Sequence, residues 1–266
     1  MIKIHVLRVG STQVDEALPF SNKSKNKLAF TGIFRGKKHQ ITVPVTSYLI
    51  EHPKGLILID TGWDTEIRTH PLKYEGIANY FASPGKLPAN EAVSEQLEKL
   101  GYQSSDIDYV ILTNMDIDHV GGIWLVKDAK HILASQKELL AASKFNPRYL
   151  RRLYKNIRIK TFQNTEYDFF DDGSVILLPL PGHSEGMTGI KITGDRNKFV
   201  VIAGDCGYGR DSYEKLILPG ITWNKKAELA SLKKLQNLAL DKNCQYVYLT
   251  HDEEQYQHKE VILRQH

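Results

Sequence analysis

The feature that most constrains the fold is a pair of β-rich runs within residues 42–60. A His-Pro-Lys-Gly turn joins the two runs, which predicts a β-hairpin. The second run, Gly55 to Ile59, is almost entirely apolar, as expected of a strand that is covered on both faces. It ends in an Asp-Thr-Gly turn at residues 60–62. Such a strand needs structure on each side, so the sequence favours a layered fold.

Further strand and helix patterns fit this layered arrangement. Strands are predicted at the N-terminus and at residues 108–113, 174–180, 187–193, 198–204 and 245–250, and helices at 90–101, 135–143, 147–155 and 225–240. Asn90 and Asn224 are the predicted N-caps of the first and last of these helices. The order suggests β-sheets between outer helices, and the length favours one domain over residues 1–266.

Composition excludes several classes of protein. The chain has 266 residues, of which 41% are hydrophobic and 25% charged, as is usual for a soluble globular protein. It has no run of about 18 apolar residues and no signal-peptide pattern, so we expect a cytoplasmic protein without a membrane partner. Cys206 and Cys244 lie far apart without CxxC spacing, which indicates neither a disulfide framework nor a cysteine zinc site.

The formal net charge of +4 is modest, but basic residues gather in two segments. These are Lys23, Lys25, Lys27, Arg35, Lys37 and Lys38 in the first, and Arg148, Arg151, Arg152, Lys155, Arg158 and Lys160 in the second. A solvated surface explains them better than a nucleic-acid patch, because no RNA- or DNA-binding motif accompanies them. We therefore expect no nucleic-acid partner, whereas an anionic substrate or product stays open.

Side chains that bind metals follow the ends of several predicted strands. In chain order they are Asp118-His119, Pro181-Gly182-His183-Ser184, Gly204-Asp205 and Thr250-His251-Asp252. Any one of these histidines alone would more often be structural than a ligand. Loops at strand ends, however, can converge on one ion. The set as a whole therefore predicts a metal centre.

This order of motifs resembles that of the metallo-β-lactamase superfamily, from about residue 40 to the C-terminus. The family pattern HxHxDH, Pro-Gly-His, bridging Asp and final His maps onto Asn114-Met115-Asp116-Ile117-Asp118-His119, His183, Asp205 and His251. The turn Asp60-Thr61-Gly62 matches an Asp-Thr-Gly turn that lies beneath the site in the family. The resemblance implies an α+β fold, a four-layer αββα sandwich, and a metal-dependent hydrolase.

The chain departs from the family pattern in one of the two metal sites. Asn114 and Asp116 stand where the family has its first two histidine ligands, and His183 is the third member of that site. An amide and a carboxylate are harder ligands than imidazoles, which disfavours zinc relative to manganese, iron, magnesium or calcium. Asn114 would be a weak, neutral ligand there.

The other site is complete according to the resemblance. Asp118, His119 and His251 are all present, and Asp205 is placed to bridge the two sites. We therefore expect one or two divalent ions, zinc or, in the oxygen-rich site, manganese or iron.

Within the superfamily the chain most resembles the acyl-homoserine lactonase group. The resemblance rests on the Tyr-Leu-Ile-Glu-His-Pro-Lys-Gly hairpin, the Ile-Asp-Thr-Gly-Trp-Asp turn, and Tyr208 three residues after Asp205. An ordinary loop tyrosine stays equally open, because Gly207 and Gly209 leave the direction of Tyr208 free. The resemblance implies attack of metal-activated water on a carbonyl, with Asp118 orienting or deprotonating the water and Tyr208 donating to the substrate oxygen.

Three functions stay open from the sequence. The first is hydrolysis of lactones or related esters, which the retained metal-binding residues favour. The second is ligand binding by a relative that has lost catalysis, which Asn114 and Asp116 favour. The third is phosphodiester hydrolysis, which the basic residues fit. Segments 18–34 and 139–154 either shape a pocket for a small-molecule substrate or pack over the sandwich and form a homodimer contact.

Overall fold

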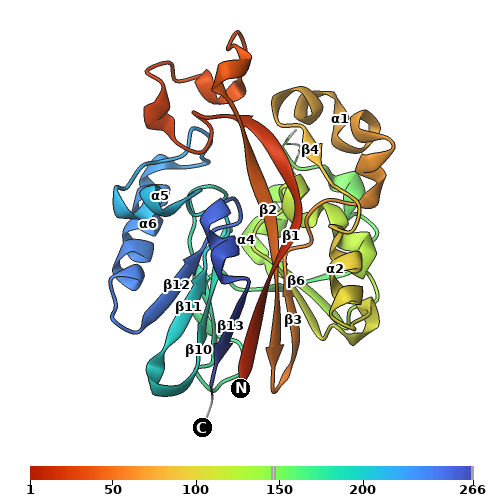
Figure 1. The fold of residues 1–266 in the computed structure, drawn as a ribbon, viewed down its shortest axis with the longest axis vertical. Coiled ribbons are helices and arrows are strands. Elements are labelled where there is room, and N and C mark those ends of the chain that lie inside the picture. Colours follow the sequence, from red (N-terminus) through yellow and green to blue (C-terminus); the bar gives the residue numbers. More distant parts are fainter. Residues whose placement is uncertain (145, 147, 265–266) are drawn as a thin grey trace.

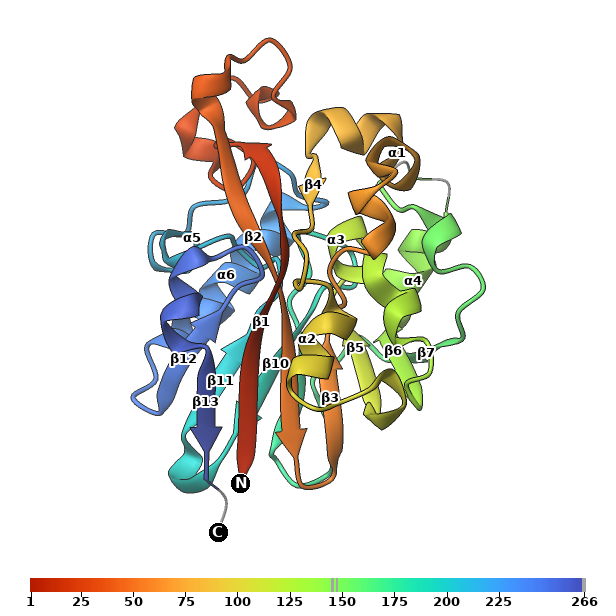
Figure 2. The same cartoon turned by 45° about the vertical axis from the view of Figure 1, so that its right-hand side comes forward.

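The strands form two sheets within residues 1–144, 146 and 148–264, which the computed structural model describes (Figures 1 and 2). The first sheet contains, in spatial order, β13 (Glu260–Leu263), β1 (Ile2–Asp15), β2 (Gln40–His52), β3 (Gly55–Ile59), β5 (Tyr109–Leu112), β6 (His131–Ser135) and β7 (Ile159–Phe162), with β4 (Gly85–Lys86) paired to β1. The second contains β12 (Cys244–Tyr248), β11 (Phe199–Ile202), β10 (Thr188–Thr193), β9 (Val175–Pro179) and β8 (Tyr167–Asp168). The predicted hairpin is β2 and β3, which pair antiparallel.

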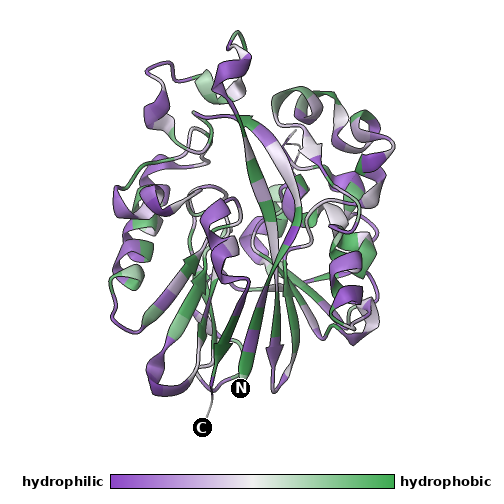
Figure 3. Cartoon of the chain, in the orientation of Figure 1, coloured by the Kyte–Doolittle hydropathy of each residue, from purple (hydrophilic) through white to green (hydrophobic). Residues whose placement is uncertain are grey.

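Helices cover the outer faces of both sheets. They are α1 (Pro71–Ala82), α2 (Val93–Lys99), α3 (Ile117–Val120), α4 (Gln136–Ser143), α5 (Arg210–Glu214) and α6 (Lys225–Ala239). Buried side chains of α2 and α4 pack on the first sheet, and those of α6 pack on the second. Figure 3 shows hydrophobic residues concentrated along the strands and hydrophilic ones over the helices. The predicted α+β sandwich of helix, sheet, sheet and helix layers is confirmed.

Strand β3 shows how the sequence builds these layers. Ile57 and Ile59 pack in the core between the two sheets, whereas Leu56 and Leu58 pack toward the helices that cover the first sheet. Side chains alternate between the faces of a strand, so a strand with a core on each face must be apolar throughout. Burying each such side chain stabilises the fold by roughly 1.5–3 kcal/mol. The prediction of a strand covered on both faces is confirmed.

One predicted helix cap is right and one is wrong. Asn224 caps α6, since its side chain accepts hydrogen bonds from the backbone amides of residues 226 and 227, both at 3.0 Å. Asn90 does not cap α2, because it has a left-handed φ of 69° and Ala92 is the N-cap residue. The carboxylate of Glu95 accepts the Ala92 N–H instead, at 2.8 Å. A glutamate in the first turn thus replaces the expected asparagine.

The helix predicted at 147–155 is also wrong for the residues that are described. Residue 147 lies outside them, and the rest contains a 3₁₀ turn at Arg151–Leu153. The carbonyl of Leu153 accepts a hydrogen bond from the side chain of Trp124 at 2.8 Å. The backbone N–H groups of Tyr154 and Lys155 both donate to the carbonyl of Arg151, which closes a single turn rather than a regular helix.

Two of the grouped basic residues are not solvated, contrary to expectation. Arg35 donates from Nε to the buried carboxylate of Asp15 at 2.5 Å. Arg148 forms an ion pair with Asp116, and the side chains of Arg35 and Arg148 are only 14% and 17% exposed. Each arginine therefore neutralises a carboxylate inside the fold.

Among the described residues, no helix is both long and apolar enough to cross a membrane. The single domain over residues 1–266 stays a prediction. The cytoplasmic location also stays a prediction.

Candidate metal centre

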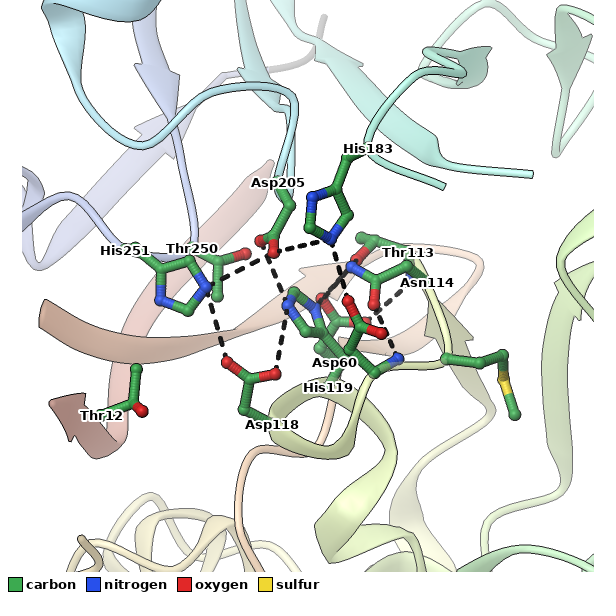
Figure 4. A network of polar contacts seen from close by, with 12 residues as sticks. Thr12, Asp60, Thr113, Asn114, Asp118, His119, His183, Asp205, Thr250 and His251 are labelled. Carbon is green, nitrogen blue, oxygen red and sulfur yellow. Dashed lines mark hydrogen bonds and ion pairs between the residues drawn. The ribbon is translucent and has the colours of Figure 1, made fainter. Parts of the chain in front are cut away.

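The predicted metal-binding residues gather at one end of the sandwich, where several strands end (Figure 4). Asp116, Asp118 and His119 follow β5, His183 lies between β9 and β10, Asp205 follows β11, and His251 follows β12. Ligand atoms of Asp118, His119 and His251 lie within 4.8 Å of one another, as do those of Asp116, His183 and Asp205. We call Asp118, His119 and His251 the complete half, and Asn114, Asp116 and His183 the altered half.

The ligand atoms of the complete half face one another across a short gap. His251 Nε2 lies 3.5 Å from Asp118 Oδ2. Asp205 reaches both histidines, with Oδ1 at 3.1 Å from His119 Nε2 and Oδ2 at 3.4 Å from His251 Nε2. Its Oδ2 also lies 3.3 Å from His183 Nε2 in the altered half. Asp205 therefore stands between the halves, where a bridging residue belongs.

His119 is oriented by Asp60, which lies behind it. The Asp60 carboxylate accepts from His119 Nδ1 at 2.8 Å and from the backbone N–H and the hydroxyl of Thr113 at 2.8 and 2.7 Å. With Nδ1 held as a donor, Nε2 keeps its lone pair for a ligand. Asp60 has a left-handed φ of 57°, which a short polar residue tolerates better than most.

The rest of the Asp-Thr-Gly turn fixes the backbone of the same histidine. Thr61 donates from its backbone N and from its hydroxyl to His119 O, each at 2.8 Å. Gly62 has a φ of 64°, and a Cβ there would lie 2.4 Å from a methyl carbon of Val9. Only glycine fits at that position without a clash. The turn therefore lies against the site and supports it.

A divalent cation fits the complete half. His251 Nδ1 donates to Pro44 O at 2.8 Å, so its Nε2 is also free to bind an ion. His119 Nε2 and Asp205 Oδ1 are buried and face each other at 3.1 Å, with no hydrogen bond to any other group. Burial alone would lower the pKa of His119, but Asp205, Asp60 and Asp118 raise it well above the ordinary value. The surroundings thus favour a positive charge at this place.

The carboxylates of the site differ in how they hold a proton. Burial raises the pKa of Asp118. Burial would also raise that of Asp205, but the charges of His119, His251 and His183 hold its pKa well below the ordinary value. Asp205 is therefore the more strongly acidic of the two carboxyls.

In the altered half, Arg148 lies against the residues that would hold an ion. Its Nε donates to Asp116 Oδ1 at 2.5 Å and its Nη2 donates to Asp116 Oδ2. Its Nη1 donates to His183 O at 2.7 Å, and its Nη2 also lies against His183 Nε2. Burial alone would raise the pKa of Asp116, but Arg148 and His183 hold it far below the ordinary value. The guanidinium therefore contacts both oxygens of Asp116 and the Nε2 atom of His183, which are the atoms that would face an ion.

Sequence reasoning missed Arg148, whose only signal was its place in a basic segment. The side chain of Asn114, the predicted weak ligand, is engaged by three other residues. Its Oδ1 accepts from the Asp116 backbone N–H at 2.9 Å, and its Nδ2 faces the Thr113 hydroxyl at 3.5 Å and Met187 Sδ at 3.8 Å. Metal binding by Asn114 stays a prediction.

Tyr208 lies inside the site. Its ring stacks on that of His251, with centroids 5.0 Å apart and planes 8° from parallel. Its hydroxyl donates to Asp205 Oδ2 at 3.4 Å, and the residue is 6% exposed. Burial raises the pKa of Tyr208 well above the ordinary value, so the hydroxyl keeps its proton at neutral pH. Tyr208 can therefore act as a hydrogen-bond donor in the site.

A cleft of about 630 Å³, part of it open to solvent, lies over the two halves. Its apolar lining consists of Val14, Leu18, Val43, Trp63, Ile117 and Ile221. Segment 18–34, one of the two predicted pocket segments, contributes Leu18, and the other, 139–154, contributes Arg148. Sequence reasoning missed the lining residues of β1, β2 and α1, because nothing in a strand or helix pattern shows which of its ends faces a cleft.

Comparison with known proteins identifies the family. A model of the metallo-beta-lactamase superfamily matches residues 41–251. The chain belongs to this superfamily. At the level of the superfamily, the prediction of a metal-dependent hydrolase is confirmed.

Curated relatives share about a quarter of their residues with this chain. N-acyl homoserine lactonase AttM of Rhizobium radiobacter is 26% identical over 230 residues, which is 82% of this chain and 85% of that protein. N-acyl homoserine lactonase of Bacillus cereus is 26% identical over 216 residues, 81% of this chain and 84% of that protein.

Solved structures confirm the predicted metallo-β-lactamase fold. An N-acyl homoserine lactone hydrolase, with the product N-hexanoyl-L-homoserine bound at its catalytic metal centre, superimposes with a TM-score of 0.80 at 22% identity, covering 96% of this chain and 95% of that one. AidC, a dizinc quorum-quenching lactonase, gives a TM-score of 0.64 at 17% identity, covering 95% of this chain and 88% of that one.

Proposed function

We propose that the protein hydrolyses lactones or related carboxylic esters with the help of a metal ion. The observation that carries this proposal is the position of Tyr208, whose hydroxyl lies beside Asp205 and whose ring stacks on His251 at the edge of the cleft. A buried, protonated donor next to candidate metal ligands suits a substrate oxygen that gains negative charge. The names of the lactonase relatives support the same reaction.

The complete half and Asp205 would hold the ion. A divalent ion there would act as a Lewis acid and lower the pKa of a water molecule that it binds. Asp118 lines the cleft, and its side chain is 14% exposed, so its carboxylate can orient a water molecule and accept its proton at Oδ1 or Oδ2. The burial that raises the pKa of Asp118 makes it a better base than a solvated aspartate.

Tyr208 would donate its hydroxyl hydrogen bond to the substrate carbonyl oxygen. Tyr208→Phe removes this donor and keeps the ring on His251. We expect kcat to fall about 10²–10³-fold, as for the loss of one donor to an oxyanion, with unchanged metal content. Equal kcat in the variant and the wild type would contradict this role for Tyr208.

The metal in this proposal is zinc, manganese or iron. Two imidazoles with carboxylates suit all three ions, because imidazole favours zinc and iron, and carboxylate favours manganese. Elemental analysis of protein purified without chelators identifies which ion is bound. The expected partner is a small-molecule substrate. That the protein binds no nucleic acid and that it can form a homodimer both stay predictions.

The substrate proposal is an N-acyl lactone, because the apolar lining of the cleft fits an acyl chain beside a polar floor. The test compares hydrolysis of N-hexanoyl homoserine lactone, a thioester and bis-(p-nitrophenyl) phosphate by the metal-loaded protein. We expect the lactone to be opened and His251→Ala to abolish that activity. Exclusive hydrolysis of the phosphodiester, or no hydrolysis after loading with Zn²⁺, Mn²⁺ or Fe²⁺, would overturn the proposal.

The ion pair between Arg148 and Asp116 favours a second candidate, a ligand-binding relative without catalysis. Such a protein would bind the lactone, as calorimetry measures, and return it unopened. Turnover of the lactone that depends on Tyr208 and His251 would exclude this candidate.

A further inference from the structure

We infer that Arg148 is the resident cation of the altered half, so that the protein holds one divalent ion, in the complete half, and a guanidinium as the second positive charge of the site. This inference rests on the proposed function as a metal-dependent hydrolase. It assigns to Arg148 a place in the site that the sequence motif does not indicate.

The contacts of Arg148 engage each of its side-chain nitrogens. Nε and Nη2 form a two-point contact with the two carboxylate oxygens of Asp116, and Nη1 donates to the backbone oxygen of His183. The planar guanidinium matches a carboxylate in this paired arrangement, which fixes its orientation as well as its charge. Arg148 is therefore anchored to both chain segments of the altered half.

These contacts use the atoms that an ion would need. Asp116, His183 and Asp205 are the group that could bind a metal in this half. Both oxygens of Asp116 accept from Arg148, and His183 Nε2 lies against Arg148 Nη2. An ion would have to displace the guanidinium, because two positive charges at this distance repel each other strongly in a buried site.

Arg148 also balances the charge of this half. Where the family pattern has a neutral histidine, this chain has Asp116, which adds a negative charge. Arg148 neutralises that charge with its side chain only 17% exposed. Without a cation, Asp116 would be a charged group left largely buried and unpaired, which is costly. Asp116 and Arg148 together therefore take the place of the histidine and the metal ion of the family pattern.

The arrangement places a fixed cation at the substrate cleft. Arg148 lines the cleft together with Asp118 and Tyr208. A carbonyl or carboxylate oxygen that enters meets the guanidinium on one side and the complete half on the other. Arg148 therefore supplies the positive charge that a second ion would otherwise bring to this side of the substrate.

The test is the number of ions that each folded chain binds. Wild type, Arg148→Ala and Arg151→Ala are dialysed against Zn²⁺ and, separately, Mn²⁺, and bound metal is measured by elemental analysis. Arg151 is an exposed arginine of the same segment and serves as the control for the lost charge. We expect one ion per chain in the wild type and in Arg151→Ala. We expect two in Arg148→Ala, because Asp116 and His183 become free to bind.

The outcomes separate this inference from the proposed function. Two ions in the wild type would overturn the inference and leave a metal-dependent hydrolase standing. One ion in folded Arg148→Ala would also overturn it, because Arg148 would not be what keeps the second ion out. No ion in the wild type with Zn²⁺, with Mn²⁺ or, in a third dialysis, with Fe²⁺ would overturn both. If Arg148→Ala fails to fold, Arg148→Gln replaces it with the same expectation, and the wild-type count still decides.

Discussion

The two halves of the site use similar residues but surround them differently. In the complete half, Asp60 and the carbonyl of Pro44 hold the Nδ1 atoms of His119 and His251, and both Nε2 atoms face carboxylates. In the altered half, His183 Nδ1 has no hydrogen bond, and its Nε2 faces Arg148 as well as the carboxylates of Asp116 and Asp205. The difference teaches that the residues behind the ligands decide what a site binds as much as the ligands do.

Removing one histidine from each half should show the difference in metal binding between the two halves most clearly. His119→Ala removes a ligand, so metal affinity should fall more than the roughly 10–100-fold typical of a supporting residue. His183→Ala is the matched variant and should retain one ion per chain. Elemental analysis after dialysis measures both. Loss of the ion from His183→Ala with retention in His119→Ala would reverse the assignment of the halves.

Asp60 tests the support behind the complete half. Asp60→Asn keeps a residue that tolerates the left-handed backbone but removes the charge that faces His119 Nδ1. We expect metal affinity to fall about 10–100-fold, as measured by competition with a metal-binding dye. Unchanged affinity would show that Asp60 supports only the fold.

Glu138 tests the support behind the altered half. Its carboxylate accepts from the backbone N–H groups of Met115 at 3.1 Å and Gly186 at 2.9 Å, which ties together the loops that carry Asp116 and His183. Glu138→Ala leaves two buried donors unpaired, and we expect the free energy of unfolding to fall by about 2–4 kcal/mol. The single bound ion should remain. Urea denaturation measures the first effect, and loss of the ion would mean that the two halves are not independent.

Glu75 shows what happens to a buried carboxyl without a cation beside it. Burial raises the pKa of Glu75 to about 7, whereas Arg148 helps to hold that of Asp116 far below its usual range. The folded chain keeps the Glu75 proton up to about pH 7 and the unfolded chain loses it near pH 4.5, so stability falls as pH rises between these values.

Glu75→Gln removes this pH dependence and keeps an acceptor for the N–H of Gly85. We expect the variant to be more stable than the wild type by about 3 kcal/mol at pH 8 and about equal to it near pH 4.5. Thermal unfolding at the two pH values measures the difference. A variant that is less stable at pH 8 would show that Glu75 is ionised in the folded chain.

Much of the fold could be predicted because its signals are local. The apolar run of β3, the helix of α6 and the cap at Asn224 each depend on neighbouring residues. The candidate ligands could be singled out because each belongs to a short motif at the end of a strand. The same reasoning failed for the helix at 147–155, where the described residues form only a 3₁₀ turn and the carbonyl of Leu153 bonds to the distant side chain of Trp124.

Arg148 could not be predicted for a related reason. It lies 32 positions from Asp116 in the chain, and nothing near either residue in the sequence points to the other. Its neighbours Arg151 and Arg152 are exposed, so composition alone assigned all three to a solvated surface. Only the folded arrangement shows that one of them turns into the site.

The central claim is that one half of the site binds a metal ion and the other holds an arginine. Anomalous X-ray diffraction from crystals of the metal-loaded protein tests it most directly. The account predicts one anomalous peak per chain, bound by Asp118, His119 and His251, with the guanidinium of Arg148 between Asp116 and His183. Two peaks per chain, with Arg148 displaced from Asp116, would contradict it.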